Sequence, residues 1–111
     1  KGDLDGALAA FLQAGKHDPN DPLIQNNLGF VYERLHARDP GAHPIAPAVE
    51  HYQRAAEKRP NDARFQRNLG LAARKAEMGD LALKALARSA QLDPKDYNVQ
   101  LALAEEYQQR K

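Results

Sequence analysis

The segments NNLGFVY at residues 26–32 and RNLGLAA at residues 67–73 each place an asparagine directly before a Leu-Gly pair, and this repetition decides the fold. A weaker third copy, LALAEEY, occupies residues 101–107. A glycine inside a helix costs about 1 kcal/mol relative to alanine. Its recurrence after the same leucine therefore predicts helices that are pressed closely against a neighbouring helix.

A second kind of segment alternates with the first. It has a small residue, a bulky residue four positions later, a small residue three positions after that, and then a proline five positions further on. The three copies are Ala7-Phe11-Ala14-Pro19, Ala48-Tyr52-Ala55-Pro60 and Ala82-Leu86-Ser89-Pro94. The first three positions of each copy lie on one stripe of a helix, where the bulky side chain fills the gap between close neighbours. Proline follows because it cannot continue a helix.

Short turns separate the two kinds of segment. They are DPND at residues 18–21, RPND at 59–62 and DPKD at 93–96. Each ends one helix at its proline and offers Asp21, Asp62 or Asp96 as the N-cap of the next helix. The pattern predicts six helices, at about residues 3–16, 22–36, 45–58, 62–76, 80–92 and 96–110.

In its order of Leu-Gly, small, bulky, small and proline positions the chain resembles the tetratricopeptide repeat (TPR), a helix-turn-helix unit of about 34 residues. Residues 63–96 span 34 positions, and the resemblance covers nearly the whole chain. It implies an all-α fold, a right-handed α-solenoid of antiparallel helix pairs. The sequence departs from the family pattern at several positions, because glutamine replaces the early tryptophan, Ala73 and Ser89 replace the usual tyrosine and second alanine, and Gly79 comes two residues late. The three glutamines are Gln25, Gln66 and Gln100.

We therefore expect residues 1–111 to form a single repeat domain. Residues 1–21 are predicted to be the second helix of an incomplete repeat, and residues 22–62 a repeat with an enlarged loop. Residues 63–96 are predicted to be a complete repeat, and residues 97–111 the first helix of a further or capping repeat. The chain begins with Lys1 rather than methionine, which suggests a fragment or a processed product.

The enlarged loop is HARDPGAHPIAP, residues 36–47, which contains three prolines and a glycine. From Pro22 to Asp62 there are 41 residues, seven more than the family period. The surplus must fall between the two helices of one repeat, so we interpret the segment as an enlarged turn and not as a domain linker. Extra loop residues cost little free energy, which favours a tolerated surface insertion. Long loops also often carry function, and a loop that contacts a partner is the alternative.

Composition argues against catalysis. The 111 residues include no cysteine and no threonine, and the only serine is Ser89, which occupies a small-residue position of the repeat. His36, His43 and His51 gather around the loop but lack a carboxylate or fourth ligand at diagnostic spacing, so no metal or other cofactor is expected. No apolar run approaches the ~20 residues that span a bilayer. A chain without cysteine suits the cytoplasm and the periplasm alike, so the compartment stays open.

The resemblance implies that the first helices of successive repeats line a concave groove that binds an extended peptide. Asn27 and Asn68 occupy equivalent places in this groove, and an asparagine can both donate to and accept from a peptide backbone. They resemble the asparagine ladder in the repeat region of O-linked N-acetylglucosamine transferases; the alternative is that they only solvate the groove. The predicted groove residues are Asn26, Asn27, Phe30, Arg34, Arg64, Arg67, Asn68, Leu71, Arg74 and Lys75.

Charge gives the groove a candidate preference. The net charge is only +1, but residues 58–88 carry 8 Lys or Arg against 3 Asp or Glu. Arg64, Arg67, Arg74 and Lys75 would suit an acidic or carboxylate-bearing peptide, although a solvated helix face is the competing interpretation. The carboxylate clamp known in this family is matched only in part, and we do not predict binding of chaperone tails.

The main functional prediction is a non-enzymatic scaffold that binds a protein or peptide. The alternative is an accessory region that presents substrates to a larger enzyme such as a glycosyltransferase. Nucleic acid is not expected as a partner, because the chain is nearly neutral overall and has only seven aromatic residues, mostly assigned to packing. The first and last helices lack a partner within their own repeat, so self-association through these terminal helices is a further expectation.

Overall fold

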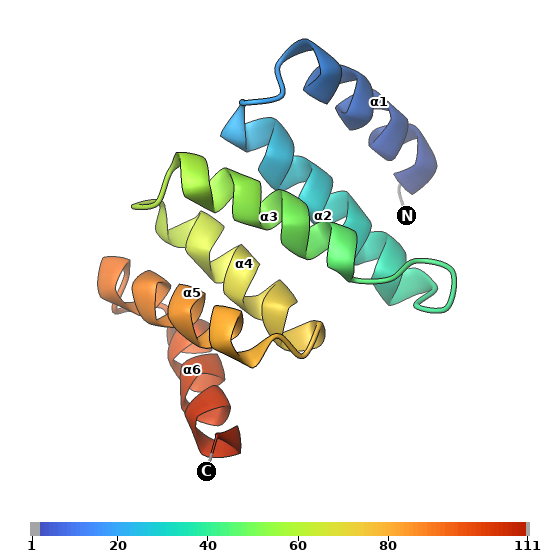
Figure 1. Ribbon diagram of the computed structural model, residues 1–111. Coiled ribbons are helices and arrows are strands. Elements are labelled where there is room, and N and C mark those ends of the chain that lie inside the picture. The colour runs from blue at the N-terminus through green and yellow to red at the C-terminus, as the bar shows by residue number, and fades with distance from the viewer. Residues whose placement is uncertain (1–2, 111) are drawn as a thin grey trace.

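A computed structural model describes residues 3–110, which fold into six α-helices joined by short turns (Figure 1). The helices are α1 (Leu4–His17), α2 (Pro22–Arg38), α3 (Ala46–Lys58), α4 (Ala63–Lys75), α5 (Gly79–Leu92) and α6 (Tyr97–Gln109). Each helix packs against the next along the chain, and α4 also contacts α6. No strand occurs between residues 3 and 110. The predicted all-α solenoid of antiparallel helix pairs is confirmed.

Aspartates begin the first helix of each pair, as the sequence predicts. The side chain of Asp21 accepts a hydrogen bond from the backbone N–H of Leu23 at 2.9 Å. Asp62 accepts from Arg64 and Phe65 at 3.0 and 3.1 Å. The equivalent bond to Asp96 comes from Val99 at 3.3 Å. These bonds satisfy backbone donors that the first turn of a helix leaves without a partner.

The three glutamines that stand in place of the family's tryptophan have a shared role. The side-chain amide of Gln25 donates to the carbonyl oxygen of Pro19 at 3.2 Å. Gln66 makes the same bond to Pro60 at 3.0 Å, and Gln100 makes it to Pro94 at 3.4 Å. Each helix is thereby tied back to the turn that precedes it. The turn is held by a hydrogen bond at a position where the family uses a large aromatic side chain.

The Leu-Gly pairs lie at the tightest contacts between helices. Gly29 faces the ring of Tyr52, and Gly70 faces the side chain of Leu86. Tyr52 and Leu86 are buried, with exposed fractions of 1% and 0%. The larger buried cluster is formed by α3, α4 and α5, and a smaller one joins Leu86 to α6. The close approach predicted from the glycines is therefore present in both pairs.

The enlarged segment between α2 and α3 is partly helical. We expected α2 to end near residue 36, but it continues to Arg38, and the connection to α3 covers only residues 39–45. His36 holds this connection, because its Nδ1 lies 2.8 Å from the carbonyl oxygen of His43. The backbone N–H of His43 in turn donates to the carbonyl oxygen of Asp39 at 3.0 Å. The segment is thus an ordered turn with its own hydrogen bonds.

None of the helices within residues 3–110 has both the length and the hydrophobicity needed to cross a bilayer.

Candidate functional site

The predicted groove residues lie on α2 and α4, and side-chain bonds link these helices to each other and to α6. We call this surface the α2–α4–α6 face. It contains a pocket of about 740 Å³. The pocket is lined by Glu33, Leu71, Arg74, Lys75, Glu77, Gly79, Glu106, Gln109 and Arg110. Charges of both signs therefore border the pocket.

The asparagines at equivalent repeat positions have different surroundings. Asn27 is exposed, whereas Asn68 is half-buried. The side-chain amide of Asn68 donates to Oδ1 of Asn26 at 3.0 Å and so links α4 to α2. One hydrogen of the Asn68 amide is thereby occupied, while its carbonyl oxygen stays available as an acceptor.

An exposed aromatic residue lies one turn before the pocket residue Glu33. Phe30 is 50% exposed. The guanidinium carbon of Arg34 lies 5.6 Å from the centre of its ring, within the range of a cation–π contact. Phe30 and Arg34 are four residues apart on one helix face. Together they present an apolar surface with a positive charge at its edge.

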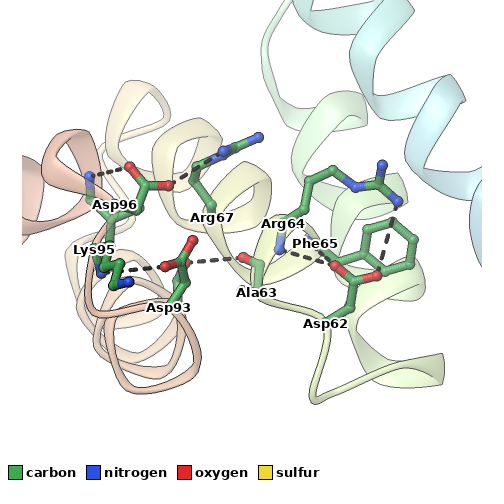
Figure 2. A network of polar contacts seen from close by, with 10 residues as sticks. Asp62, Ala63, Arg64, Phe65, Arg67, Asp93, Lys95 and Asp96 are labelled. Carbon is green, nitrogen blue, oxygen red and sulfur yellow. Dashed lines mark hydrogen bonds and ion pairs between the residues drawn. The ribbon is translucent and has the colours of Figure 1, made fainter.

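At the start of α4 the predicted basic residues differ in their pairing (Figure 2). Arg67 bonds to the Asp96 carboxylate, with Nη1 and Oδ2 3.3 Å apart, and so links α4 to the cap of α6. Arg64 is exposed, and its guanidinium carbon lies 5.2 Å from the centre of the Phe65 ring. Its nearest carboxylate, that of Asp62, is 4.0 Å away, a longer distance than in the Arg67–Asp96 pair. Arg64 is therefore the more accessible of these two cations.

At the other end of α4 both predicted cations form ion pairs. Arg74 bonds to Glu105 and Glu106 of α6, each at 3.1 Å. The side chain of Glu106 is only 8% exposed. Lys75 pairs with Glu33 of α2.

Glu33 also makes a hydrogen bond to a buried core residue. Its Oε1 accepts a hydrogen bond from the Tyr52 hydroxyl at 2.7 Å. Burial of the tyrosine and this bond both raise the pKa of Tyr52 above its usual value of 10. Glu33 thus connects the exposed Lys75 to a buried ring on the neighbouring helix.

These contacts change the interpretation of the positive charge on the face. Three of the predicted cations, Arg67, Arg74 and Lys75, are paired with carboxylates of the same chain. This role of Glu33 and Glu106 was not predicted from the sequence. A signal does exist, because Glu105 and Glu106 follow Arg74 by about one repeat, which places them on adjacent first helices.

The histidines near the loop serve the structure. His51 stacks on Tyr32, with ring centres 5.4 Å apart, and its Nδ1 lies 2.7 Å from Oε1 of Gln25. His36 binds the loop carbonyl described above. Within residues 3–110 no three His, Asp or Glu side chains lie close enough to hold a metal ion.

Comparison with known proteins agrees with the fold. Residues 1–35 match the family model described as TPR repeat. The structure is similar to a crystal structure of MamA, with a TM-score of 0.84 and 26% identity, covering 98% of this chain and 60% of that one. It is also similar to the first TPR of Spaghetti (RPAP3) bound to the HSP90 peptide SRMEEVD, with a TM-score of 0.81 and 20% identity, covering 95% of this chain and 78% of that one. The first TPR domain of human RPAP3 has a TM-score of 0.78 and 20% identity, with coverage of 95% and 77%. A search of curated proteins found no match.

The fold, the turn chemistry and the tight Leu-Gly contacts define an α-solenoid built from helix pairs. By the family-model match over residues 1–35 and by its fold, the chain is similar to tetratricopeptide-repeat proteins. It spans about 60% of the MamA chain, and at 20% identity the likeness to the RPAP3 domains concerns the fold alone.

Proposed function

We propose that this chain is a non-enzymatic scaffold that binds an extended peptide segment across the α2–α4–α6 face. The observation that carries the proposal is the exposed Phe30–Arg34 pair one turn from the 740 Å³ pocket. A half-exposed aromatic ring offers an apolar anchor. Asn27 beside it can donate to and accept from a peptide backbone without requiring a particular side chain.

Ser89 and two of the pocket carboxylates are engaged in contacts within the chain, which favours a binding role. The hydroxyl of Ser89 is buried and donates to the backbone carbonyl of Ala63 at 3.0 Å. Two of the three carboxylates that line the pocket, Glu33 and Glu106, accept from cations of the same chain. A general base must reach the proton it abstracts, and these carboxylates are held by other partners.

The ion pairs also refine which ligand groups would bind. An acidic ligand would have to compete with Glu33 for Lys75 and with Glu105 and Glu106 for Arg74. Arg34 and Arg64 are exposed, and Arg64 lies 4.0 Å from the Asp62 carboxylate. They are the predicted cations most accessible to a ligand carboxylate. A ligand with an apolar side chain for Phe30 and a carboxylate for Arg34 or Arg64 therefore suits the face best.

The RPAP3 domain carries an acidic peptide in its structure. The carboxylate clamp that binds chaperone tails in this family is matched only in part by this chain. Asn68 fits the pattern, but Phe30 and Ala102 occupy positions where the pattern has a polar or basic side chain. We therefore do not extend the HSP90 peptide to this chain.

A peptide array read with purified variants tests the proposal. Peptides that bind the unchanged chain should bind at least about tenfold more weakly to Phe30→Ala. A loss of this size is typical when an aromatic side chain that anchors an interface is truncated. Asn27→Ala and Asn68→Ala should each weaken binding, with the larger loss at the exposed Asn27. Asn20→Ala, an exposed asparagine in the turn between α1 and α2, is the matched control.

Unchanged binding in both groove asparagine variants would remove the ladder from the mechanism. If Phe30→Ala also bound normally, the ligand would lie on another surface and the proposal would be wrong. Circular dichroism of each variant separates lost binding from lost folding.

A further inference from the structure

Within residues 3–110 the contact between the two helices of a repeat occurs twice, between α2 and α3 and between α4 and α5. At its centre a bulky side chain covers a glycine: Tyr52 covers Gly29, and Leu86 covers Gly70. Both bulky residues are almost completely buried. These two pairs show what a complete repeat looks like in this sequence.

The first helix of each pair contributes the Leu-Gly side of this contact. The equivalent surface occurs a third time, on α6, where no helix within residues 3–110 covers it. Leu103, Ala104 and Tyr107 follow Leu69, Gly70 and Ala73 by one repeat of 34 residues. Gly70 and Ala73 are buried, whereas Ala104 is exposed and Tyr107 is 55% exposed. Within the described residues the α6 surface is therefore a first-helix surface that no second helix covers.

The second helix of each pair contributes the bulky side chain that covers the glycine. The equivalent surface occurs a third time, on α1. Ala7, Phe11 and Ala14 correspond to Ala48, Tyr52 and Ala55, whose exposed fractions are 0%, 1% and 0%. On α1 all three positions are only half-buried, and α1 has no buried residue. Within residues 3–110 this second-helix surface lacks its first helix, and α1 and α6 lie at opposite ends of the stack (Figure 1).

We propose that α6 of one copy packs against α1 of a second copy and completes a repeat between two chains. The template is the chain's own helix pair, in which the two helices run antiparallel. That arrangement places the end of α6, with Arg110, beside the start of α1, with Asp3 and Asp5. Arg110 pairs with Asp80 of its own chain at 2.7 Å, so an ion pair with α1 would replace this exposed contact. The contact buries Phe11 over Ala104.

The interface is heterologous, because the two surfaces differ. Each added copy leaves one free α6 surface and one free α1 surface at the ends of the assembly. Such contacts generate open chains unless the rotation closes into a ring. The proposal therefore predicts assemblies that grow with concentration beyond a dimer.

Ala104 makes the contact weaker than its templates. A β-carbon built on Gly29 would lie 2.5 Å from the Tyr52 ring, and one on Gly70 would lie 2.7 Å from Leu86. The methyl group of Ala104 therefore holds the two helices further apart than in either complete pair. Ala104→Gly should bring them together and tighten the association.

Sedimentation velocity of the 111-residue chain over a wide concentration range tests the proposal. The weight-average sedimentation coefficient should rise with concentration. Ala104→Arg should weaken the association at least tenfold, because it places a charge at the centre of the contact while the exposed position leaves the single chain undisturbed. Gln109→Arg adds the same charge on a different side of α6 and should associate normally. A chain that stays monomeric throughout, or an association that Ala104→Arg leaves unchanged, overturns the proposal.

Mixing experiments test the pairing of unlike surfaces. Ala104→Arg keeps an intact α1, and Ala7→Arg keeps an intact α6, so each alone should be monomeric and an equimolar mixture should form a heterodimer. An excess of Ala104→Arg should also shorten assemblies of the unchanged chain, because its α1 can bind a free α6 while its own α6 cannot bind a further copy. This experiment needs no substitution in α1. Absence of both effects means that α6 and α1 do not meet. If Ala104→Gly associates no more tightly than the unchanged chain, then α6 and α1 do not approach as closely as the helices of the α2–α3 and α4–α5 pairs.

Discussion

Gly29 lies so close to Tyr52 that a β-carbon on the glycine would be 2.5 Å from Cδ1 of the tyrosine ring. Real β-carbons essentially never approach other heavy atoms to this distance, and the Tyr52 ring is buried, with an exposed fraction of 1%. Gly70 has the same relationship to Leu86, where a β-carbon would also be 3.1 Å from the backbone nitrogen. The repeated Leu-Gly pair is therefore a packing requirement of the solenoid.

Substituting these glycines should destabilise the fold although alanine is the better helix former. Alanine gains about 1 kcal/mol in helix propensity, but overpacking a close contact costs about 1–3 kcal/mol. We expect Gly29→Ala and Gly70→Ala to lower the free energy of unfolding in urea. Gly15→Ala is the control, since its β-carbon would meet Ile24 and Leu28 at an ordinary 3.8 Å. It should raise stability by about 0.5–1 kcal/mol, and a loss there as large as at Gly29 would contradict the packing explanation.

Glu77 adopts a backbone conformation that favours glycine. Its φ is 59°, in the left-handed region, at the turn between α4 and α5. The left-handed conformation costs an L-residue about 1–2 kcal/mol. Glu77→Gly should therefore raise the free energy of unfolding by up to about 1 kcal/mol, after the greater unfolded-state entropy of glycine is subtracted. Ala76→Gly, where φ is −84°, should instead lower stability in the same thermal or urea titration.

Two neighbouring cations on α4 should differ in their contribution to stability. Arg74 pairs with Glu106, whose side chain is 8% exposed, whereas the side chain of Lys75 is 51% exposed. Removing Arg74 leaves a buried carboxylate without its partner, which costs about 1–3 kcal/mol. Exposed pairs contribute about 0–1 kcal/mol. Urea titration should show a clearly larger loss for Arg74→Ala than for Lys75→Ala; equal losses would mean that burial of Glu106 has no energetic consequence.

Stability should fall on mild acidification because of His51. Burial of its imidazole, and to a lesser degree the charge of Arg54, hold the pKa of His51 below its usual value of 6.5, while Glu50 opposes them. The unfolded chain therefore binds this proton at a higher pH than the folded chain does. The free energy of unfolding should decrease as pH falls through about 6.5. His51→Gln should reduce this slope, and a slope that this substitution leaves unchanged would show that His51 does not cause it.

Glu33 should limit the binding of acidic ligands. It neutralises Lys75 on the proposed peptide-binding face. Glu33→Gln keeps an oxygen that can accept from the Tyr52 hydroxyl but removes the negative charge. We expect acidic peptides to bind this variant more tightly than the unchanged chain at low ionic strength, with the gain shrinking as salt is added. Glu57→Gln, at an exposed position on α3, is the charge-matched control. Equal binding by both variants would show that Lys75 does not meet the ligand.

Features that depend on local spacing were predictable from the sequence. The caps at Asp21, Asp62 and Asp96 follow from the residues beside each proline, since a capping bond joins groups two or three residues apart. The bonds from Gln25, Gln66 and Gln100 also span only six residues. They were missed because glutamine has no characteristic preference for such a position, although its threefold recurrence was visible.

The sequence by itself determined the helices, their turns and the close pairing at Gly29 and Gly70, because these arise from backbone preferences and from side chains that recur with the repeat. Only the tertiary structure decided which charges on the α2–α4–α6 face are free to meet a ligand. Lys75 meets Glu33 across 42 positions, and Arg74 meets Glu106 across 32. Such pairs depend on the stagger and curvature with which successive helix pairs stack, and these are set by the summed packing of the core.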